Sequence, residues 1–214
     1  MYYKAGKHKE AGLPYSPFKA LVAPRPIGWI STQSTDGIAN LAPYSFFNAI
    51  SELPPMVMFV SAPDERSGKS TPDHHSAKDS LANIMQTGEF GVNIVGKKQI
   101  EGMITSAELL SSDIDEFEAA KLVKKQASDI NVPLVAGAPA QLECQLHDII
   151  TLPGTDTRAG CKMVLGRVVS IHIDDDVIRD GKVDVSLFQP VSRLGYRDYA
   201  TIDELFSISQ GVSR

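Results

Sequence analysis

Cysteines, basic runs and long apolar runs are all scarce in this chain of 214 residues. Only Cys144 and Cys161 occur, without a CxxC pair, so a reducing cytoplasm is the expected location. The net charge is −5 and no basic run exceeds the pairs Lys97-Lys98 and Lys124-Lys125, which makes nucleic acid and anionic membrane poor candidates as partners. No apolar stretch approaches the ~18 residues of a membrane span, and the N-terminus lacks the apolar stretch of a signal peptide.

Motifs for common catalytic and metal-binding chemistries are also missing. The chain contains no GxGxxG, Walker-type loop, HExxH or GxSxG. The pair His74-His75 has no further ligands at suitable spacing, and Asp174–Asp176 lacks the EF-hand pattern, so no metal site is expected. Both cysteines lie in apolar strand-like runs and are expected to be inert core thiols. Because no catalytic side chain is identified, an enzyme with this inventory would depend on a bound cofactor.

Short apolar runs separated by turns make up most of the chain. With 43% hydrophobic residues, it suits a single domain over 1–214 with a polar N-terminal arm at 1–13. The polar segment 62–77 is unusually long for a connection and is a functional candidate. A helix is expected from a Ser76–Asp79 capping box to Gly88. A helical insertion is expected at 97–128, where a second box, Ser112–Asp115, separates two helical pieces. Because βαβ alternation is absent, the pattern predicts a mainly β fold, a β-barrel with a few inserted α-helices. Strands are expected in a hairpin over 27–50 and at 56–60, 89–95, 142–150, 161–173 and 183–188.

The segment 24–47, PRPIGWISTQSTDGIANLAPYSFF, is the most informative part of the sequence. Ile27–Ile30 reads as a buried strand, and Ser34–Gly37 as a tight turn. Pro43 then interrupts what should be a regular inner strand, and the amides beside it would need acceptors other than a neighbouring strand. A flat ring with carbonyl and imide edges could supply them. The alternative is a β-bulge at a barrel corner.

Several ordered motifs resemble one known family. PRPIGWIST, DG, NLAPYSFFNAIS, PPMVMFVS and KDSLANIMQTGEFGVNIV, with the closing RLGYRDY, are together similar to the flavin reductase-like family, which includes flavoredoxins and NAD(P)H:flavin oxidoreductases. The resemblance covers residues 14–200 and implies a split β-barrel of the FMN-binding, Greek-key type. The family commonly ends in RLGGxxY, so Tyr196 stands where a second glycine is usual.

The resemblance also implies where FMN would bind. Lys78-Asp79-Ser80 matches the family's KDT, and a helix N-terminus with a lysine and a hydroxyl forms a phosphate cradle; alternatively Asp79 only closes a capping box. Arg25 would reach the phosphate or make a structural pair. The segment Asn40–Ser45 would face the isoalloxazine ring, where donors to N1 and the C2 carbonyl stabilise reduced flavin. Core packing is the competing interpretation of Trp29. The implied cofactor-binding residues are Arg25, Trp29, Ser31, Thr32, Asn40, Leu41, Ala42, Pro43, Tyr44, Ser45, Ser61, Lys78, Asp79 and Ser80.

The activity that the resemblance implies is that of an FMN oxidoreductase. The first expectation is an NAD(P)H-dependent flavin reductase, in which N5 of FMN accepts the hydride. The alternatives are a flavoredoxin-like electron carrier, an FMN-dependent oxidoreductase or oxygenase of an organic substrate, and a barrel without cofactor. Expected partners are a second copy of the chain, with FMN near the dimer interface, a nicotinamide donor and an electron-acceptor protein. NADH and NADPH are not distinguished, because neither a dinucleotide fold nor a 2′-phosphate cluster is visible.

Overall fold

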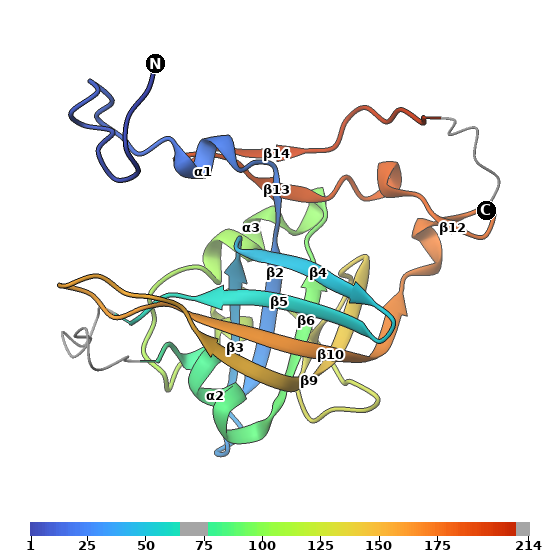
Figure 1. The fold of residues 1–214 in the computed structure, drawn as a ribbon. Coiled ribbons are helices and arrows are strands. Elements are labelled where there is room, and N and C mark those ends of the chain that lie inside the picture. Colours follow the sequence, from blue (N-terminus) through green and yellow to red (C-terminus); the bar gives the residue numbers. More distant parts are fainter. Residues whose placement is uncertain (65–76, 209–214) are drawn as a thin grey trace.

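The computed structural model describes residues 1–64 and 77–208. Antiparallel strands make up most of it, and Figure 1 shows them wrapped into a barrel, with the N-terminal arm and α1 on one side. The barrel strands are β2 (Gly28–Gln33), β3 (Ala39–Tyr44), β4 (Phe47–Glu52), β5 (Pro55–Ser61), β6 (Glu89–Ile94), β9 (Ala140–Thr151) and β10 (Lys162–Ile173).

Smaller elements lie outside the barrel. The helices are α1 (Phe18–Leu21), α2 (Asp79–Thr87), α3 (Ile100–Thr105) and α4 (Glu116–Ala119), with 3₁₀ turns η1 (Lys97–Gln99), η2 (Asp175–Val177) and η3 (Val185–Leu187). The short strands are β1 (Arg25–Pro26), β7 (Lys124–Lys125), β8 (Leu134–Val135), β11 (Ile178–Arg179), β12 (Lys182–Val183), β13 (Val191–Arg193) and β14 (Tyr199–Thr201). Within the described ranges, none of the helices has the length and apolar character needed to cross a membrane.

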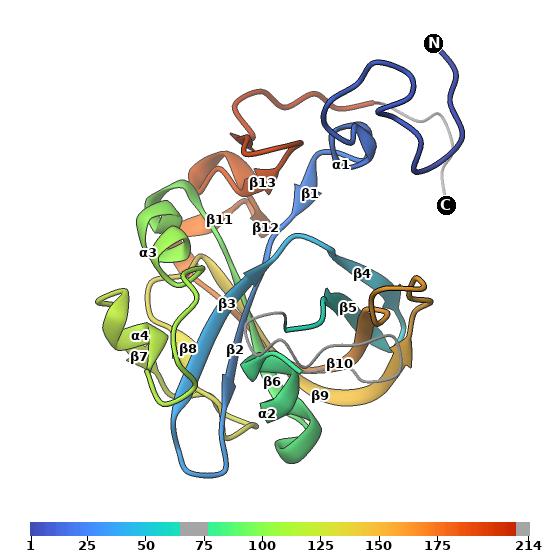
Figure 2. The same ribbon diagram turned by 90° about the vertical axis from the view of Figure 1, so that its left-hand side faces the viewer.

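The barrel is open along one seam. The seven strands follow the order β3-β2-β6-β9-β10-β5-β4, so the two edge strands, β3 and β4, are neighbours in the sequence. Figure 2 shows the sheet curling around until these edges approach each other, with α2 next to one end of the barrel. The fold is therefore a split β-barrel with inserted helices, as the sequence predicted.

Strand alternation divides the buried side chains between two cores. Ile30 of β2 joins the first core inside the barrel, where the rings of Tyr44, Phe59 and Phe90 pack together. Its neighbour Trp29 points the other way, into a second core that also contains residues from α3 and α4. β2 and β3 therefore separate the barrel interior from the layer formed by α3 and α4.

Pro43 lies on an edge strand rather than an inner one, which corrects the expectation from the sequence. β3 pairs with β2 without a register shift from Gly28↔Tyr44 to Gln33↔Ala39, so there is no β-bulge at Pro43. The residue is tolerated because its missing N–H falls on the free edge of the sheet. The edge is open because β3 is the last strand of the sheet and pairs only with β2. The proline does not break any existing ladder bonds.

Helix α2 begins two residues after the first described residue of its segment. Its N-cap is Lys78, in an extended conformation and without a side-chain capping bond, instead of the Ser76 that the sequence indicated. Ser76 lies outside the described residues, as do His74-His75 and most of the predicted 62–77 loop. The predicted end is confirmed, because Gly88 closes the helix with a left-handed φ of 74°.

The segment 97–128, predicted as a helical insertion, is helical only in part. η1 and α3 cover 97–105 and α4 covers 116–119, while β7 occupies 124–125. The cap of α4 is Asp115, whose carboxylate accepts from the backbone N–H groups of Phe117 and Glu118. The Ser112–Asp115 spacing thus marked the right place, but Asp115 is the cap.

A small sheet, β1-β13-β14, carries the closing RLGYRDY motif away from the barrel. Tyr196 has a φ of 53°, in the left-handed region that favours glycine. This conformation gives a physical reason why glycine suits the position in the resembling family. Here the tyrosine ring packs edge-on against Tyr15, with centroids 6.1 Å apart.

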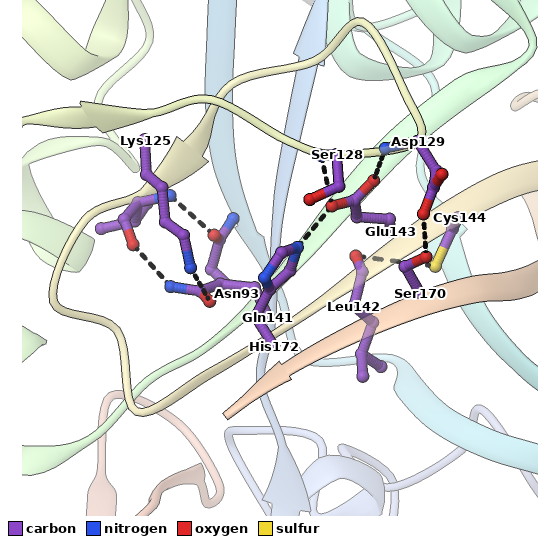
Figure 3. Close-up of polar contacts among 11 residues, drawn as sticks. Asn93, Lys125, Ser128, Asp129, Gln141, Leu142, Glu143, Cys144, Ser170 and His172 are labelled. Atoms are coloured by element: carbon purple, nitrogen blue, oxygen red, sulfur yellow. Dashed lines mark hydrogen bonds and ion pairs between the residues drawn. The ribbon is translucent and has the colours of Figure 1, made fainter. Parts of the chain in front are cut away.

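The buried carboxylate of Glu143 holds the loop at residues 128–129 against strands β9 and β10 (Figure 3). Glu143 on β9 is fully buried and accepts from the backbone N–H groups of Ser128 (2.7 Å) and Asp129 (2.6 Å). His172 on β10 also bonds to it, and Asp129 in turn accepts from Ser170. Burial opposes ionisation of Glu143, but the bonds from His172 and the two amides outweigh it and lower its pKa.

Replacing Glu143 with Gln is expected to reduce the free energy of unfolding at pH 7 by about 1–3 kcal/mol, because an amide cannot accept at both positions. Since the pKa is lowered in the folded state, the carboxylate stabilises the protein above the unfolded pKa, near 4.5, and this contribution is lost as the pH falls through the folded value. Urea unfolding at pH 7 and pH 4, with exposed Glu118→Gln as control, measures both effects. Equal stability of the Glu143 variant and wild type at pH 7 would contradict the assignment.

Candidate functional site

A hollow of about 290 Å³ lies at the open seam of the barrel, and we call it the seam hollow. Its walls come from the end of β3, the turn after it, the end of β5, the start of α2, the loop after α3 and the first residue of α4. The lining residues are Lys19, Asn40, Ala42, Pro43, Tyr44, Ser45, Phe46, Val60, Ala62, Lys78, Asp79, Ser80, Ser106, Ala107, Glu108, Leu109, Leu110 and Glu116.

Residues from two distant parts of the sequence prediction meet in this hollow. The β3 segment proposed to face a ring and the α2 segment proposed to hold a phosphate form parts of the same wall. Eight of the fourteen predicted residues line it: Asn40, Ala42, Pro43, Tyr44, Ser45, Lys78, Asp79 and Ser80.

A buried hydrogen-bond network forms the floor between these two segments. The amide nitrogen of Asn40 donates to Glu116 Oε1 at 2.8 Å, and its oxygen accepts from the hydroxyl of Ser80 at 2.6 Å. Thr32 also donates to the Asn40 oxygen at 3.3 Å and accepts from Asn83 on α2 at 3.0 Å. The network joins β2, β3, α2 and α4, so it fixes the orientation of Asn40 and the position of the α2 N-terminus.

Glu116 of this network and Tyr44, which lies beside it, have pKa values shifted by burial. Burial raises the pKa of Glu116, and the charge of Asp79 adds to the shift, while bonds from the Leu41 amide and Asn40 oppose it. Burial likewise raises the pKa of Tyr44, and Asp79 and Glu116 add to it against the hydroxyls of Ser80 and Ser61. Tyr44 therefore remains a neutral hydroxyl at physiological pH.

The α2 end of the hollow contains a cation, Lys78, beside the acidic Asp79 of the first helical turn. Lys19 of α1 also lines the hollow, and the first turn of α2 has no side-chain cap from Lys78. The first intrahelical bond runs from the Ala82 N–H to the Lys78 carbonyl, so the helical ladder begins at this end of the hollow. A helix N-terminus with a lysine at its cap position is chemically suited to a phosphate.

Arg25 has the structural role that the sequence left as its alternative. Its guanidinium donates to the carbonyl oxygens of Lys19, Val22 and Leu194, the last at 2.8 Å, and thereby ties α1 to the C-terminal sheet. Burial lowers its pKa, and the nearby Arg193 adds to this. Arg25 does not line the seam hollow, so the structure does not place it at a phosphate.

The other predicted residues outside the lining are buried behind it. Trp29 is fully buried, and its indole N–H donates to Ser106 at 2.8 Å, so it packs in the second core. Asn93 donates to Ser31 at 3.2 Å, which holds that hydroxyl inside the sheet. The predicted residues that do not line the hollow are Arg25, Trp29, Ser31, Thr32, Leu41 and Ser61.

Sequence reasoning missed one side of the hollow. The loop 106–110 and Glu116 line it, as do Lys19 and Phe46, and none of these was predicted. Glu116 is 76 residues away from Asn40 in the sequence, and no motif links the two. The only available signal was the capping pattern before α4, which indicated a helix but not which side chain it would direct inward.

Residues 21–193 match the family profile of the flavin reductase like domain. The chain belongs to the flavin reductase-like family. An uncharacterized relative from Halalkalibacterium halodurans is 32% identical over 189 residues, covering 88% of this chain and 87% of the relative.

Solved structures of this family share the split-barrel architecture. Nitrilotriacetate monooxygenase component B from Bacillus cereus is similar with a TM-score of 0.85 and 27% identity, over 97% of this chain and 98% of that one. The 2-nitrobenzoate 2-nitroreductase NbaA of Pseudomonas fluorescens is similar with a TM-score of 0.77 and 27% identity, over 100% and 99% of the chains. Both neighbours have names from redox chemistry, which fits an oxidoreductase of the flavin reductase-like family.

Proposed function

We propose that the seam hollow binds FMN and that the protein is an NAD(P)H-dependent flavin reductase. The observation that supports this most strongly is the meeting of the α2 N-terminus with segment 40–45 in a single hollow. One end offers the Lys78 ammonium and the α2 N-terminus for an anionic tail, and the other offers an open strand edge for a planar ring. Family membership agrees with this assignment.

The donor set of the hollow fits FMN, but in a different way from that expected from sequence. The Ser80 hydroxyl donates to Asn40 and is therefore not available to donate to a phosphate. The Lys78 ammonium and the N-terminus of α2 would bind the phosphate instead. Lys78 thus becomes the side chain with the largest expected contribution to phosphate binding. Asn40 and Ser80 position the helix start against β3.

The free edge of β3 limits which groups can meet the ring. The Leu41 N–H is taken by Glu116 at 3.2 Å, and Pro43, which faces the same edge two residues later, has no N–H. Within the hollow this edge therefore offers mainly the carbonyl oxygen of Pro43, which suits an imide N–H such as that of a flavin. Bound FMN would supply hydride acceptance at N5; the chain itself binds and orients the ring and limits access of water.

A second copy of the chain is part of the proposal. A hollow of about 290 Å³ is at the lower end of the range for small-molecule pockets, so one protomer would cover only part of FMN. Phe46 and Leu109 line the hollow and are 39% and 73% exposed, which leaves apolar surface at its mouth for a partner to cover. We place this homodimer in the cytoplasm, with a nicotinamide donor reaching the uncovered face of the ring.

The absorbance spectrum of the purified protein, before and after adding FMN, tests cofactor binding. Anaerobic mixing of the loaded protein with NADH and with NADPH then tests the reaction. Rapid bleaching with repeated turnover is the expected result for a reductase. Reduction only by a partner protein or chemical reductant would favour a flavoredoxin-like carrier, while a protein that never takes up FMN would contradict the proposed function.

A further inference from the structure

Glu116 holds a buried carboxylate in the wall of the seam hollow. It is only 5% exposed, although it belongs to a helix of four residues on the outside of the barrel. One oxygen accepts from the Asn40 side chain at 2.8 Å and the other from the Leu41 N–H at 3.2 Å. Both oxygens therefore act as acceptors, the arrangement that suits the ionised form.

Among the described residues no ion pair to Glu116 is found, although the charged residues Lys19, Lys78, Asp79 and Glu108 line the same hollow. Asp79 on α2 is close enough to raise its pKa, and Tyr44 on β3 is neutral. The neighbouring Asp115 is paired with Lys124 on the outer side of α4. Lys78 lines the same hollow at the α2 N-terminus, where the proposed phosphate would use its charge. A buried carboxylate that accepts two hydrogen bonds and has no ion pair among the described residues is thus built into the wall beside segment 40–45.

We infer that Glu116 is a positioning residue that also makes the seam hollow favour oxidised over reduced FMN. This inference rests on the proposed function. The carboxylate fixes Asn40 and the edge of β3 by two hydrogen bonds, and its charge repels the negative charge that a flavin ring gains on reduction. Such a site would release reduced flavin more readily than oxidised flavin, as a reductase that supplies flavin to another protein requires.

The test compares wild type with Glu116→Gln, which removes the charge and keeps the size. The affinities for oxidised and for reduced FMN, and the midpoint potential of the bound FMN, are measured anaerobically at several pH values. We expect wild type to bind reduced FMN more weakly than oxidised FMN. In the variant, the ratio of the affinity for oxidised FMN to the affinity for reduced FMN should fall about tenfold, and the midpoint potential of the bound FMN should rise. In wild type the ratio should also widen as pH rises through the titration of Glu116. Glu118→Gln, an exposed change on the same helix, is the control.

The outcomes separate the inference from the function on which it rests. No FMN binding by wild type would overturn both. Equal weakening of both redox forms in Glu116→Gln, with an unchanged potential, would show a purely structural role and overturn the inference alone. If the variant is too unstable to load, the pH dependence of the wild-type ratio decides, and a ratio that does not vary with pH would overturn the inference.

Discussion

Lys78→Ala is expected to weaken FMN binding by about 10- to 100-fold, the range for losing a charge-assisted hydrogen bond. The ammonium is the side-chain cation at the α2 N-terminus, and the Ser80 hydroxyl cannot replace it because it already donates to Asn40. The fold should not change, since the Lys78 side chain makes no capping bond to α2. Titration of FMN fluorescence quenching gives the dissociation constant, and thermal unfolding of the apoprotein reports on the fold.

Lys98→Ala is the matched control for this prediction. Lys98 is exposed on η1 and is not among the residues of the seam hollow, so its loss changes the net charge equally without affecting the site. Equal FMN affinity in wild type and Lys78→Ala would remove Lys78 from the phosphate site. A similar loss in both variants would indicate only a general charge effect.

Ala42→Phe is expected to give a folded, colourless protein. Ala42 lines the seam hollow and borders the first core, so a benzyl group there would occupy the space proposed for the ring. Overpacking of this kind costs about 1–3 kcal/mol of stability, which a domain of this size is expected to tolerate. The flavin absorbance of the purified variant and its circular dichroism spectrum measure binding and folding separately.

Ala49→Phe makes the same change at an exposed position of β4, outside the seam hollow, and should retain FMN. Full flavin occupancy in Ala42→Phe would count directly against placing the ring beside segment 40–45. An unfolded variant would show only that Ala42 belongs to the core, and the smaller change Ala42→Val would then be used.

The long strands could be predicted from the sequence because their apolar runs extend over many residues. The runs 142–150 and 161–173 correspond to β9 and β10, and the hairpin after Ile27 corresponds to β2 and β3. Pro43 was misread because its effect depends on whether a strand lies at an edge, which local sequence does not specify. The sequence overestimated the helical length of segment 97–128, because apolar residues at helical spacing can also occur in short turns that pack against the barrel.

The lining of the candidate site was predictable where it follows a local motif and not where it depends on distant contacts. Motifs indicated Lys78 and segment 40–45, and residues of both line the seam hollow. Glu116 was missed because it reaches Asn40 only after the chain has folded. The hydrogen bonds of Arg25 to backbone carbonyls and of Ser80 to Asn40 could not be predicted either, because a residue type does not specify its hydrogen-bond partner.

A crystal structure of the protein grown with FMN tests the central claim most directly. The isoalloxazine ring is expected in the seam hollow beside residues 40–45, with the phosphate at Lys78 and the first turn of α2. Flavin bound elsewhere on the chain, or a seam hollow that stays filled by its own side chains at saturating FMN, would contradict the account.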